Sequence, residues 1–238
     1  LEIKSQHPDT LLFFRLGDFY EMFFDDAEVA SRELEIVLTA RDGGDAGRIP
    51  MCGVPHHSAH TYIAKLISRG YRVAICEQME DPREAKGLVK REVVRIITPG
   101  TVIEDNMLSD TAANYLASVY IDDKSAGLAF ADISTGEFKI CQWHGKDVLS
   151  LIYAELLRLN PSECLIAEDQ PSLWTDEQSH LTNLPMVTAE FPRSYKNACE
   201  VLMHHFKVAT LEGFGINDSY DLAVCAAAAI LKYLEQTC

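Results

Sequence analysis

The sequence predicts two α/β domains joined by a short linker. Over the first hundred residues, apolar segments with the period of two of a strand alternate with segments of helical period, which indicates a mixed sheet with packed helices. Beyond residue 114, three strand-like segments precede a helix, a further strand and more helices. The stretch between the two regions is polar and lacks either period. We therefore expect domains over residues 1–100 and 114–238 and a linker over residues 101–113.

Composition places the chain among globular intracellular proteins. Of its 238 residues 47% are hydrophobic, and no apolar run approaches the ~18 residues that a membrane span needs. The chain begins at Leu1 and has no signal peptide, so we expect a fragment of a longer cytoplasmic protein without membrane contact. Seven cysteines without any Cys-x-x-Cys pair exclude a zinc ribbon or a disulfide framework and predict reduced thiols.

The acidity of the chain is concentrated in its second half. The net charge is −15, and the first hundred residues hold 13 Lys and Arg against 16 Asp and Glu, whereas the remainder holds 8 against 20. A nearly neutral first half lacks the positive surplus for strong binding to DNA phosphates, so any DNA affinity of this chain alone should be weak. The acidic second half is expected to meet protein partners.

A hairpin near the start of the chain is the most informative local feature. The apolar segments Leu11–Leu16 and Phe19–Phe23 are separated by Gly17-Asp18, which is turn chemistry. The period of two divides the second strand between two faces, with Phe19, Glu21 and Phe23 on one and Tyr20 and Met22 on the other. A flat aromatic and a carboxylate then share one side. The alternative is a buried hairpin whose phenylalanines all belong to the core.

Caps, breakers and periodicity predict the other elements of the first domain. Asp25 and Glu28 have the spacing of a capping box, and the helix that follows should bury Ala27, Ala30 and Leu34. We expect this helix to end near Glu35. The elements expected after it are, in order, a strand over Ile36–Thr39, a glycine-rich loop over Arg41–Arg48, a helix from the cap Ser58 to Gly70, a strand over Arg72–Gln78, a short helix at Asp81-Pro82 and a strand over Arg91–Thr98.

The second domain is predicted to contain an antiparallel meander followed by helices. In order, we expect strands over Tyr115–Ile121, Gly127–Ile133 and Glu137–Trp143, a helix over Lys146–Leu159, strands over Glu163–Ala167 and Met186–Ala189, and helices over Ser194–Phe206 and Asn217–Gln236. The first of these helices should bury Leu149, Ile152, Tyr153, Leu156 and Leu157. This order of elements fits an RNase H-like α/β domain.

Metal and nucleotide sites receive little support from the residues. His56 and His60 lie four apart, but no Glu or Cys nearby completes a ligand set. The glycines after Arg41 are not followed by the Lys-Ser/Thr of a phosphate loop. An RNase H-like nuclease would use Asp132, yet Glu155 and Glu168-Asp169 are unconvincing partners, and an Asp at a strand end more often bonds the following turn. We therefore expect no catalytic residue, no metal site and no cofactor in this chain.

Several segments resemble the MutS family of DNA mismatch repair proteins. In order they are Gly17-Asp18-Phe19-Tyr20-Glu21, Ile49–His57, Val73–Gln78 and Val93–Thr101, with weaker likeness at Ala131–Phe138 and Gly213-Phe214-Gly215. Ordered agreement of this kind is far more specific than one short motif. It spans essentially the whole chain, which resembles the first two domains of a longer protein.

The resemblance implies that the first domain reads mismatched double-stranded DNA. Phe19 would be the wedge that stacks on a mispaired base from the minor groove, and Glu21 would hydrogen-bond the ring of that base. The loop containing Arg41 and Arg48 would approach the DNA groove or its phosphates. A mismatch has lost pairing and stacking, so opening the step costs less there than in intact duplex.

The resemblance also implies a connector role for the second domain. It would dock the repair partner MutL, for which we select Asn197, Glu200, His204 and His205 from the predicted helix that ends at Phe206. ATP, Mg²⁺ and self-dimerisation would belong to the full-length protein, because this sequence has no Gly-x-x-x-x-Gly-Lys-Ser/Thr. A metal-dependent nuclease and a protein-docking scaffold without a DNA role remain the alternatives.

Overall fold

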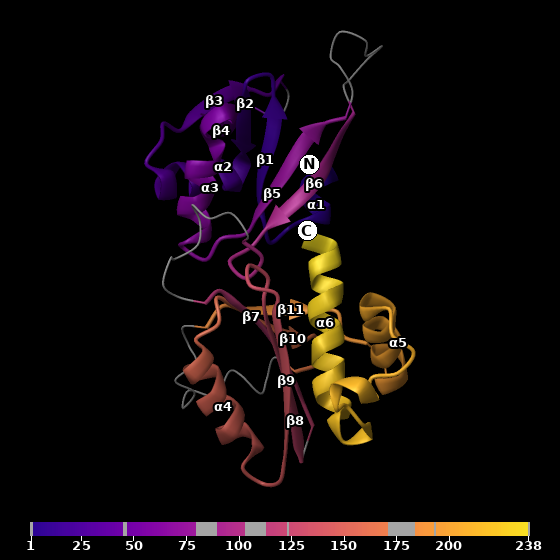
Figure 1. Cartoon of the computed structure of the whole chain (residues 1–238). Coiled ribbons are helices and arrows are strands. Elements are labelled where there is room, and N and C mark those ends of the chain that lie inside the picture. Colours follow the sequence, from indigo (N-terminus) through magenta and orange to yellow (C-terminus); the bar gives the residue numbers. More distant parts are fainter. Residues whose placement is uncertain are drawn as a thin grey trace. The chain divides into compact units, whose positions relative to one another are not determined.

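The computed structural model of the chain (Figure 1) describes residues 2–44, 47–79, 90–102, 113–122, 124–170, 184–192 and 194–237. It contains two compact units, Leu1–Pro99 and Gly100–Gln236. The predicted helix at Asp81-Pro82 and most of the predicted linker, residues 103–112, lie outside the described residues. In the part of the chain that is described, no helix combines the length and apolar character of a membrane span.

The first unit is built on a six-stranded mixed sheet with the order β3-β4-β2-β1-β5-β6. Its strands are β1 (Leu11–Leu16), β2 (Phe19–Phe23), β3 (Thr39–Asp42), β4 (Arg48–Pro55), β5 (Val73–Gln78) and β6 (Arg91–Ile97). All neighbouring strands are antiparallel except β1 and β5, which run parallel. The fold class of this unit is therefore the mixed α/β arrangement that the sequence predicts.

The predicted hairpin is confirmed at both strand boundaries. Leu16 pairs with Phe19, and Gly17 lies at a φ of +58°, a left-handed conformation that glycine adopts without steric cost. Along β2, Tyr20 and Met22 are buried whereas Phe19 is 46% exposed. The period of two thus separates a core face from a second face of the strand.

One face of this sheet is covered by helices. Among the described residues, the helices of the unit are α1 (Glu2–Gln6), α2 (Phe24–Leu34) and α3 (Ala59–Ile67), the last preceded by a short 3-10 helix over His56–Ser58. Helices α2 and α3 pack together on this face, whereas Ile3 of α1 lines a hollow with Phe14 and Phe23. Cys52, the β4 partner of Met22, approaches the Ala27 carbonyl to 3.4 Å through its Sγ. Helix α2 therefore covers the Tyr20 and Met22 face and buries Ala27, Ala30 and Leu34 as predicted. We call the opposite side, which carries Phe14, Phe19, Glu21 and Phe23, the outer face.

The predicted capping box before α2 is wrong. The chain passes from β2 into the helix without a loop, through a φ of +53° at Phe24, so the N-cap is Phe23 and Asp25 already lies in the first turn. Asp26 is buried instead, where its carboxylate accepts hydrogen bonds from the Leu12 amide at 3.0 Å and from Lys4 at 2.9 Å. A positive φ at a phenylalanine is not readable from the sequence, and it moves the helix start.

The region between α2 and α3 differs most from the prediction. The strand expected over Ile36–Thr39 is wrong, since β3 begins only at Thr39. Residues 41–48 are not one loop, because Arg41 lies in β3 and Arg48 opens β4. Strand β4 itself was not expected, since Pro50, Gly53 and Pro55 interrupt the strand pattern. Pairing with β2 on one side and β3 on the other holds this segment extended.

The second unit contains a five-stranded mixed sheet with the order β11-β10-β7-β8-β9. Its strands are β7 (Tyr115–Ile121), β8 (Ser125–Asp132), β9 (Glu137–His144), β10 (Glu163–Ala167) and β11 (Met186–Ala189). The first three form the predicted antiparallel meander, and β10 and β11 extend the sheet in parallel from β7. This is the strand order and direction of an RNase H-like domain, so that prediction is confirmed.

Helices cover both faces of the second sheet (Figure 1). They are α4 (Val148–Leu159), α5 (Tyr195–Phe206) and α6 (Asp221–Thr237). Alternate residues of β7 separate the two cores, because Ala117 and Val119 pack with α4 whereas Leu116 packs with α5 and α6. Helix α6 is buried along most of its length, as its run of alanines predicts.

Two helix details of this unit differ from the predictions. Helix α4 buries Val148, Ile152, Leu156 and Leu159, whereas Leu157, predicted to face inward, is 56% exposed. The predicted face of α4 was therefore rotated relative to the one that packs on the sheet, and Leu149 is exposed as well. Helix α6 begins at Asp221 rather than at Asn217, whose side chain instead caps a 3-10 turn by accepting from the Ser219 amide at 2.9 Å.

The contact between β8 and α6 predicts the effect of a single methyl group. A Cβ at Gly127 would lie 2.2 Å from both the Ala223 nitrogen and the Leu222 carbonyl carbon, which are backbone atoms that cannot rotate away. Gly127→Ala should therefore lower the free energy of unfolding by ~1–3 kcal/mol or more, as overpacked cores do. Urea unfolding measures this change.

Gly213→Ala is the matched control for this variant. A Cβ at Gly213 would meet no atom of the described residues within 4 Å, so the same chemical change in the same unit should leave the unfolding midpoint nearly unaltered. Equal midpoints for the two variants would contradict the close packing of α6 on β8.

Candidate functional site

Phe19 and Glu21 lie on the outer face of the first sheet. They alternate along β2 with the buried Tyr20, so the aromatic ring and the carboxylate project to the same side. Phe19 is 46% exposed although it belongs to a central hairpin of the unit. Phe13 is fully buried, as the alternative of a hairpin with only core phenylalanines requires. Phe19 is half exposed, so that alternative does not hold for it.

Glu21 is held in an environment that is unfavourable to its charge. Its Oε2 is buried and receives no hydrogen bond from any of the described residues. Burial raises the pKa of the Glu21 carboxyl above its ordinary value, and the positive charge of Arg41 opposes this rise only in part. A buried acceptor without a donor costs about 1–3 kcal/mol, so a ligand that supplied a hydrogen bond would relieve this cost.

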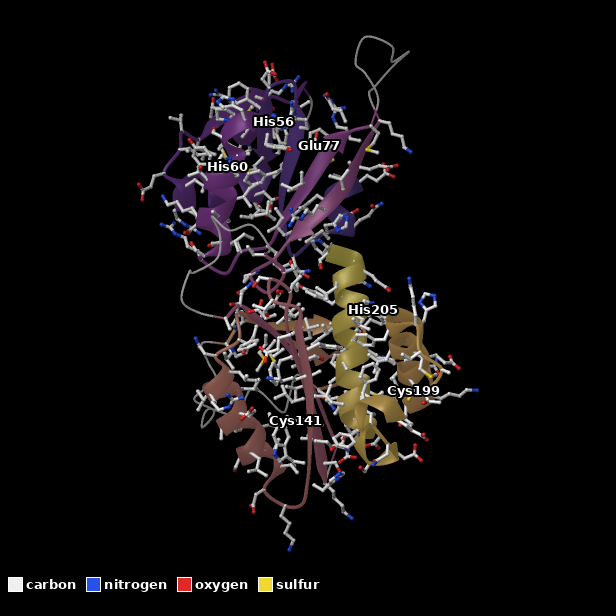
Figure 2. The ribbon with its side chains drawn as sticks, viewed as in Figure 1. His56, His60, Glu77, Cys141, Cys199 and His205 are labelled. Atoms are coloured by element: carbon white, nitrogen blue, oxygen red, sulfur yellow. The ribbon has the colours of Figure 1, made fainter. Side chains whose placement is uncertain are left out.

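The hairpin tip is anchored from its covered side. The His56 amide donates to the Asp18 carbonyl at 2.8 Å, and the His56 ring lies 5.4 Å from the Tyr20 ring. The Tyr20 hydroxyl donates to the Glu77 carboxylate, and burial together with this bond raises the pKa of Tyr20. Figure 2 labels His56 and Glu77, which come from different elements of the first unit. These contacts hold the turn, and with it the strand position of Phe19.

The outer face contains one further aromatic side chain, Phe14, that sequence reasoning missed. Phe14, the β1 partner of Glu21, meets Phe23 edge-on at 6.4 Å, and the Arg91 guanidinium lies 5.1 Å from the centre of its ring. An apolar hollow of about 650 Å³ lies beside them; its lining includes Ile3, Leu12, Phe14, Phe23 and Phe24. The hairpin register could have identified Phe14, because it places this residue directly opposite Glu21.

The two candidate arginines occupy different places. Arg41 pairs with Ile49 at the β3 edge and, by the strand period, projects to the same outer face as Glu21. Arg48 pairs with Asp42, one position away, and so projects to the opposite side. The structure thus brings Phe19, Glu21 and Arg41 to one face and leaves Arg48 on the opposite face, in the strand pair next to the β3–β4 loop.

The candidate residues of the second unit do not all share one surface. Asn197, Glu200 and His204 line a hollow of about 710 Å³ between α5, α6 and the end of β11. The rest of its lining is Glu190, Pro192, Val201, Lys232 and Glu235. Lys232 pairs with Glu190 at 2.9 Å, so acidic side chains dominate the rim. His205, labelled in Figure 2, does not line this hollow and packs edge-on against Phe206 at 4.9 Å.

Asp132 has the turn-forming role that the sequence favours. Its carboxylate accepts from the Ser134 amide at 3.0 Å, from the Ser134 hydroxyl at 2.6 Å and from the Asn114 amide at 3.2 Å. Burial raises the pKa of Asp132, but the hydrogen bonds from Ser134, Asn114 and Thr135 together lower it below its ordinary value. Glu155, the suggested partner of a nuclease site, pairs with Arg158 at 2.9 Å. Among the described residues, no three His, Cys, Asp or Glu side chains gather in a way that could hold a metal ion.

Comparison with known proteins assigns both units. The family model for MutS domain I matches residues 1–106, and that for MutS domain II matches residues 114–238. A protein of Syntrophomonas wolfei named DNA mismatch repair protein MutS is 52% identical over the whole chain, which covers 28% of that relative. Proteins of the same name from Symbiobacterium thermophilum and Syntrophobacter fumaroxidans are 47% and 49% identical over 99% of the chain, which covers 27% and 26% of their lengths. The chain spans about a quarter of the length of these relatives, and it belongs to the MutS family.

Proposed function

We propose that this chain supplies the mismatch-reading part of a DNA mismatch repair protein. Phe19 wedges beside a mispaired base, and Glu21 hydrogen-bonds the base on which Phe19 stacks. The observation that carries the proposal is the outer face of β2, where a half-exposed aromatic ring alternates with a carboxylate whose buried oxygen has no donor among the described residues. An exposed ring and an unsatisfied polar atom are both expected where a ligand completes the site.

The wedge reads the deformability of DNA rather than its base sequence. Separating a base step costs a few kcal/mol, and part of this cost is already paid where pairing is lost. Stacking a base on an aromatic side chain returns about 1–3 kcal/mol. Because Phe19 is exposed before binding, it can stack on DNA without first leaving the protein core.

Glu21 suits a base that presents either a donor or an acceptor. As a carboxylate it accepts from the N3–H of thymine, and as a neutral acid it donates to the N7 of a purine. Burial, which raises the pKa of Glu21, favours the neutral form, and the negative phosphates of bound DNA act in the same direction. A rotation of the Glu21 side chain would bring its buried oxygen to the base.

Other parts of the full-length protein complete the activity in this proposal. With 13 Lys and Arg against 16 Asp and Glu, the first hundred residues have no positive surplus. Arg41, which shares the face of Phe19 and Glu21, therefore contributes a local phosphate contact, and further DNA affinity must come from elsewhere. Binding of ATP with Mg²⁺ and self-dimerisation are functions of the part of the full-length protein that this chain does not cover. The second unit relays mismatch recognition to that part and binds MutL at the acidic hollow between α5 and α6.

Replacing Phe19 separates the wedge from a structural role. In the full-length protein, Phe19→Ala removes the stacking surface, so affinity for a mismatched duplex should fall about ten- to a hundredfold while affinity for matched duplex barely changes. Fluorescence anisotropy with labelled duplexes measures both. Thermal melting of the present chain should be nearly unaffected, because the ring is half exposed.

Two control variants bracket this result. Phe13→Ala removes a fully buried ring and should cost ~3–5 kcal/mol of stability, whereas Phe214→Ala removes an exposed ring of the second unit and should leave mismatch binding unaltered. Retained discrimination in Phe19→Ala, or a melt as low as that of Phe13→Ala, would remove Phe19 from the site.

The raised pKa of Glu21 predicts a pH-dependent stability difference. Because the folded protein favours the neutral acid, ionised Glu21 lowers stability at pH values above its folded pKa, and the cost disappears below the ordinary Glu value of about 4.3. Glu21→Gln should therefore melt higher than the parent chain at pH 7, and the difference should shrink as the pH falls to about 4. A constant difference between pH 7 and pH 4 would show that burial of the charge is not the cause.

Charge reversal in the acidic hollow tests the partner surface. Glu200→Lys places a positive charge on the hollow that a basic surface of MutL would occupy, and should weaken MutL binding by up to about tenfold, chiefly through the association rate. Glu212→Lys makes the same change outside the hollow and should have little effect. Surface plasmon resonance with MutL gives both rates. Equal loss of MutL and mismatch binding in Glu200→Lys would indicate misfolding and remove the assignment.

A further inference from the structure

Gly53 lies at the centre of the outer face. In β4 it pairs directly with Glu21, between Pro55, which pairs with Phe19, and Met51, which pairs with Phe23. Directly paired residues of neighbouring strands project to the same side of a sheet. A side chain at position 53 would therefore emerge beside the wedge and the carboxylate of the proposed mismatch site.

The glycine is not required by the backbone conformation at this position. The glycines with positive φ in the described residues include Gly17 and Gly70, and Gly53 is not one of them. An ordinary L-residue could adopt its strand conformation, and β-strands generally disfavour glycine. The reason for glycine here must therefore be the space that a side chain would fill.

The space that a side chain would fill is part of the proposed site. A Cβ at Gly53 would lie 3.2 Å from the Tyr20 carbonyl oxygen, 3.5 Å from Glu21 Cγ and 3.8 Å from Phe19 Cδ1. The first distance is tighter than an ordinary contact, so even a methyl group would press on β2 between its two functional residues. The other two distances place that methyl group between the Phe19 ring and the Glu21 side chain.

We propose that Gly53 is a specificity-determining residue of the mismatch site, an inference that rests on the proposed function. Its missing side chain leaves a bare stretch of backbone between Phe19 and Glu21, and the edge of the unstacked nucleobase lies against it. Glycine thus lets one flat ring stack on Phe19 and still come close enough to Glu21 for a hydrogen bond. Matched duplex, which keeps its bases stacked, does not use this space.

The test compares Gly53→Ala and Gly53→Val in the full-length protein. The probes are a duplex with one G·T mismatch and the matched duplex of otherwise identical sequence. The added side chain displaces its neighbours by a few tenths of an ångström at a site that needs close geometry. We therefore expect Gly53→Ala to bind the mismatched duplex about three- to tenfold more weakly than the parent protein, and Gly53→Val more weakly still. Affinity for the matched duplex should stay within about twofold of the parent protein under the same reasoning. Thermal melting of Gly53→Ala should remain close to that of the parent.

Gly213→Ala is the control for the added methyl group, since a Cβ there has no atom within 4 Å in the part of the chain that the structure describes. It should keep parental mismatch affinity. If Gly53→Val fails to fold, Gly53→Ala alone decides the question. Parental discrimination in a folded Gly53→Ala protein overturns the inference. So does a parallel loss of melting temperature and of both duplex affinities, because that pattern describes a glycine needed only for strand packing.

Phe19→Ala in the same assay distinguishes failure of this inference from failure of the proposed function. If Phe19→Ala loses discrimination and Gly53→Ala keeps it, only the role of Gly53 is wrong. If Phe19→Ala keeps discrimination, the mismatch site is not on this face and both proposals fall.

Discussion

The register of the β1–β2 hairpin is the constraint on which the first unit depends. Leu16 pairs with Phe19 across a turn in which Gly17 has a positive φ, and this pairing determines the face of every later residue of β2. A slip of one residue would turn Tyr20 and Met22 outward and bury Phe19 with its neighbouring carboxylate. Burial of Tyr20 and Met22 therefore fixes the register of the hairpin, and the same register keeps Phe19 exposed. Stability and the candidate site come from alternate positions of the same five-residue strand.

The same strand also contains Glu21, whose environment is unfavourable to its charge. Glu21 keeps a buried oxygen without a donor among the described residues, and burial raises its pKa. Natural sequences depart from local consistency chiefly where function requires it. Asp132 in the second unit makes the contrast clear, because its buried carboxylate is satisfied by the turn that it closes. The Asp132 carboxylate is thus satisfied within the fold, whereas Glu21 keeps a buried oxygen that no described residue satisfies.

The sequence predicted elements whose signals are local. The hairpin, the meander of the second unit and strand β10 follow from periodicity and turn residues, and their boundaries agree with the structure within two residues. Strand β4 was missed because Pro50, Gly53 and Pro55 resemble breakers, and only pairing on both sides keeps the segment extended. The start of α2 depends on a positive φ at Phe24, which no residue pattern signals. For the candidate site, Phe19 and Glu21 were selected from one strand, and the predicted hairpin register could have added Phe14. Gly53 depends on the pairing of β2 with β4, which only the fold supplies.

The most direct measurement of base unstacking by Phe19 uses 2-aminopurine, whose fluorescence rises when it loses its stacking neighbours. The probe base is placed next to a G·T mismatch, and the duplex is titrated with the full-length parent protein and with its Phe19→Ala variant. The account predicts a rise in fluorescence with the parent protein on mismatched duplex, no rise on matched duplex, and no rise with the variant at saturating concentration. An equal rise with Phe19→Ala, or with matched duplex, would contradict it.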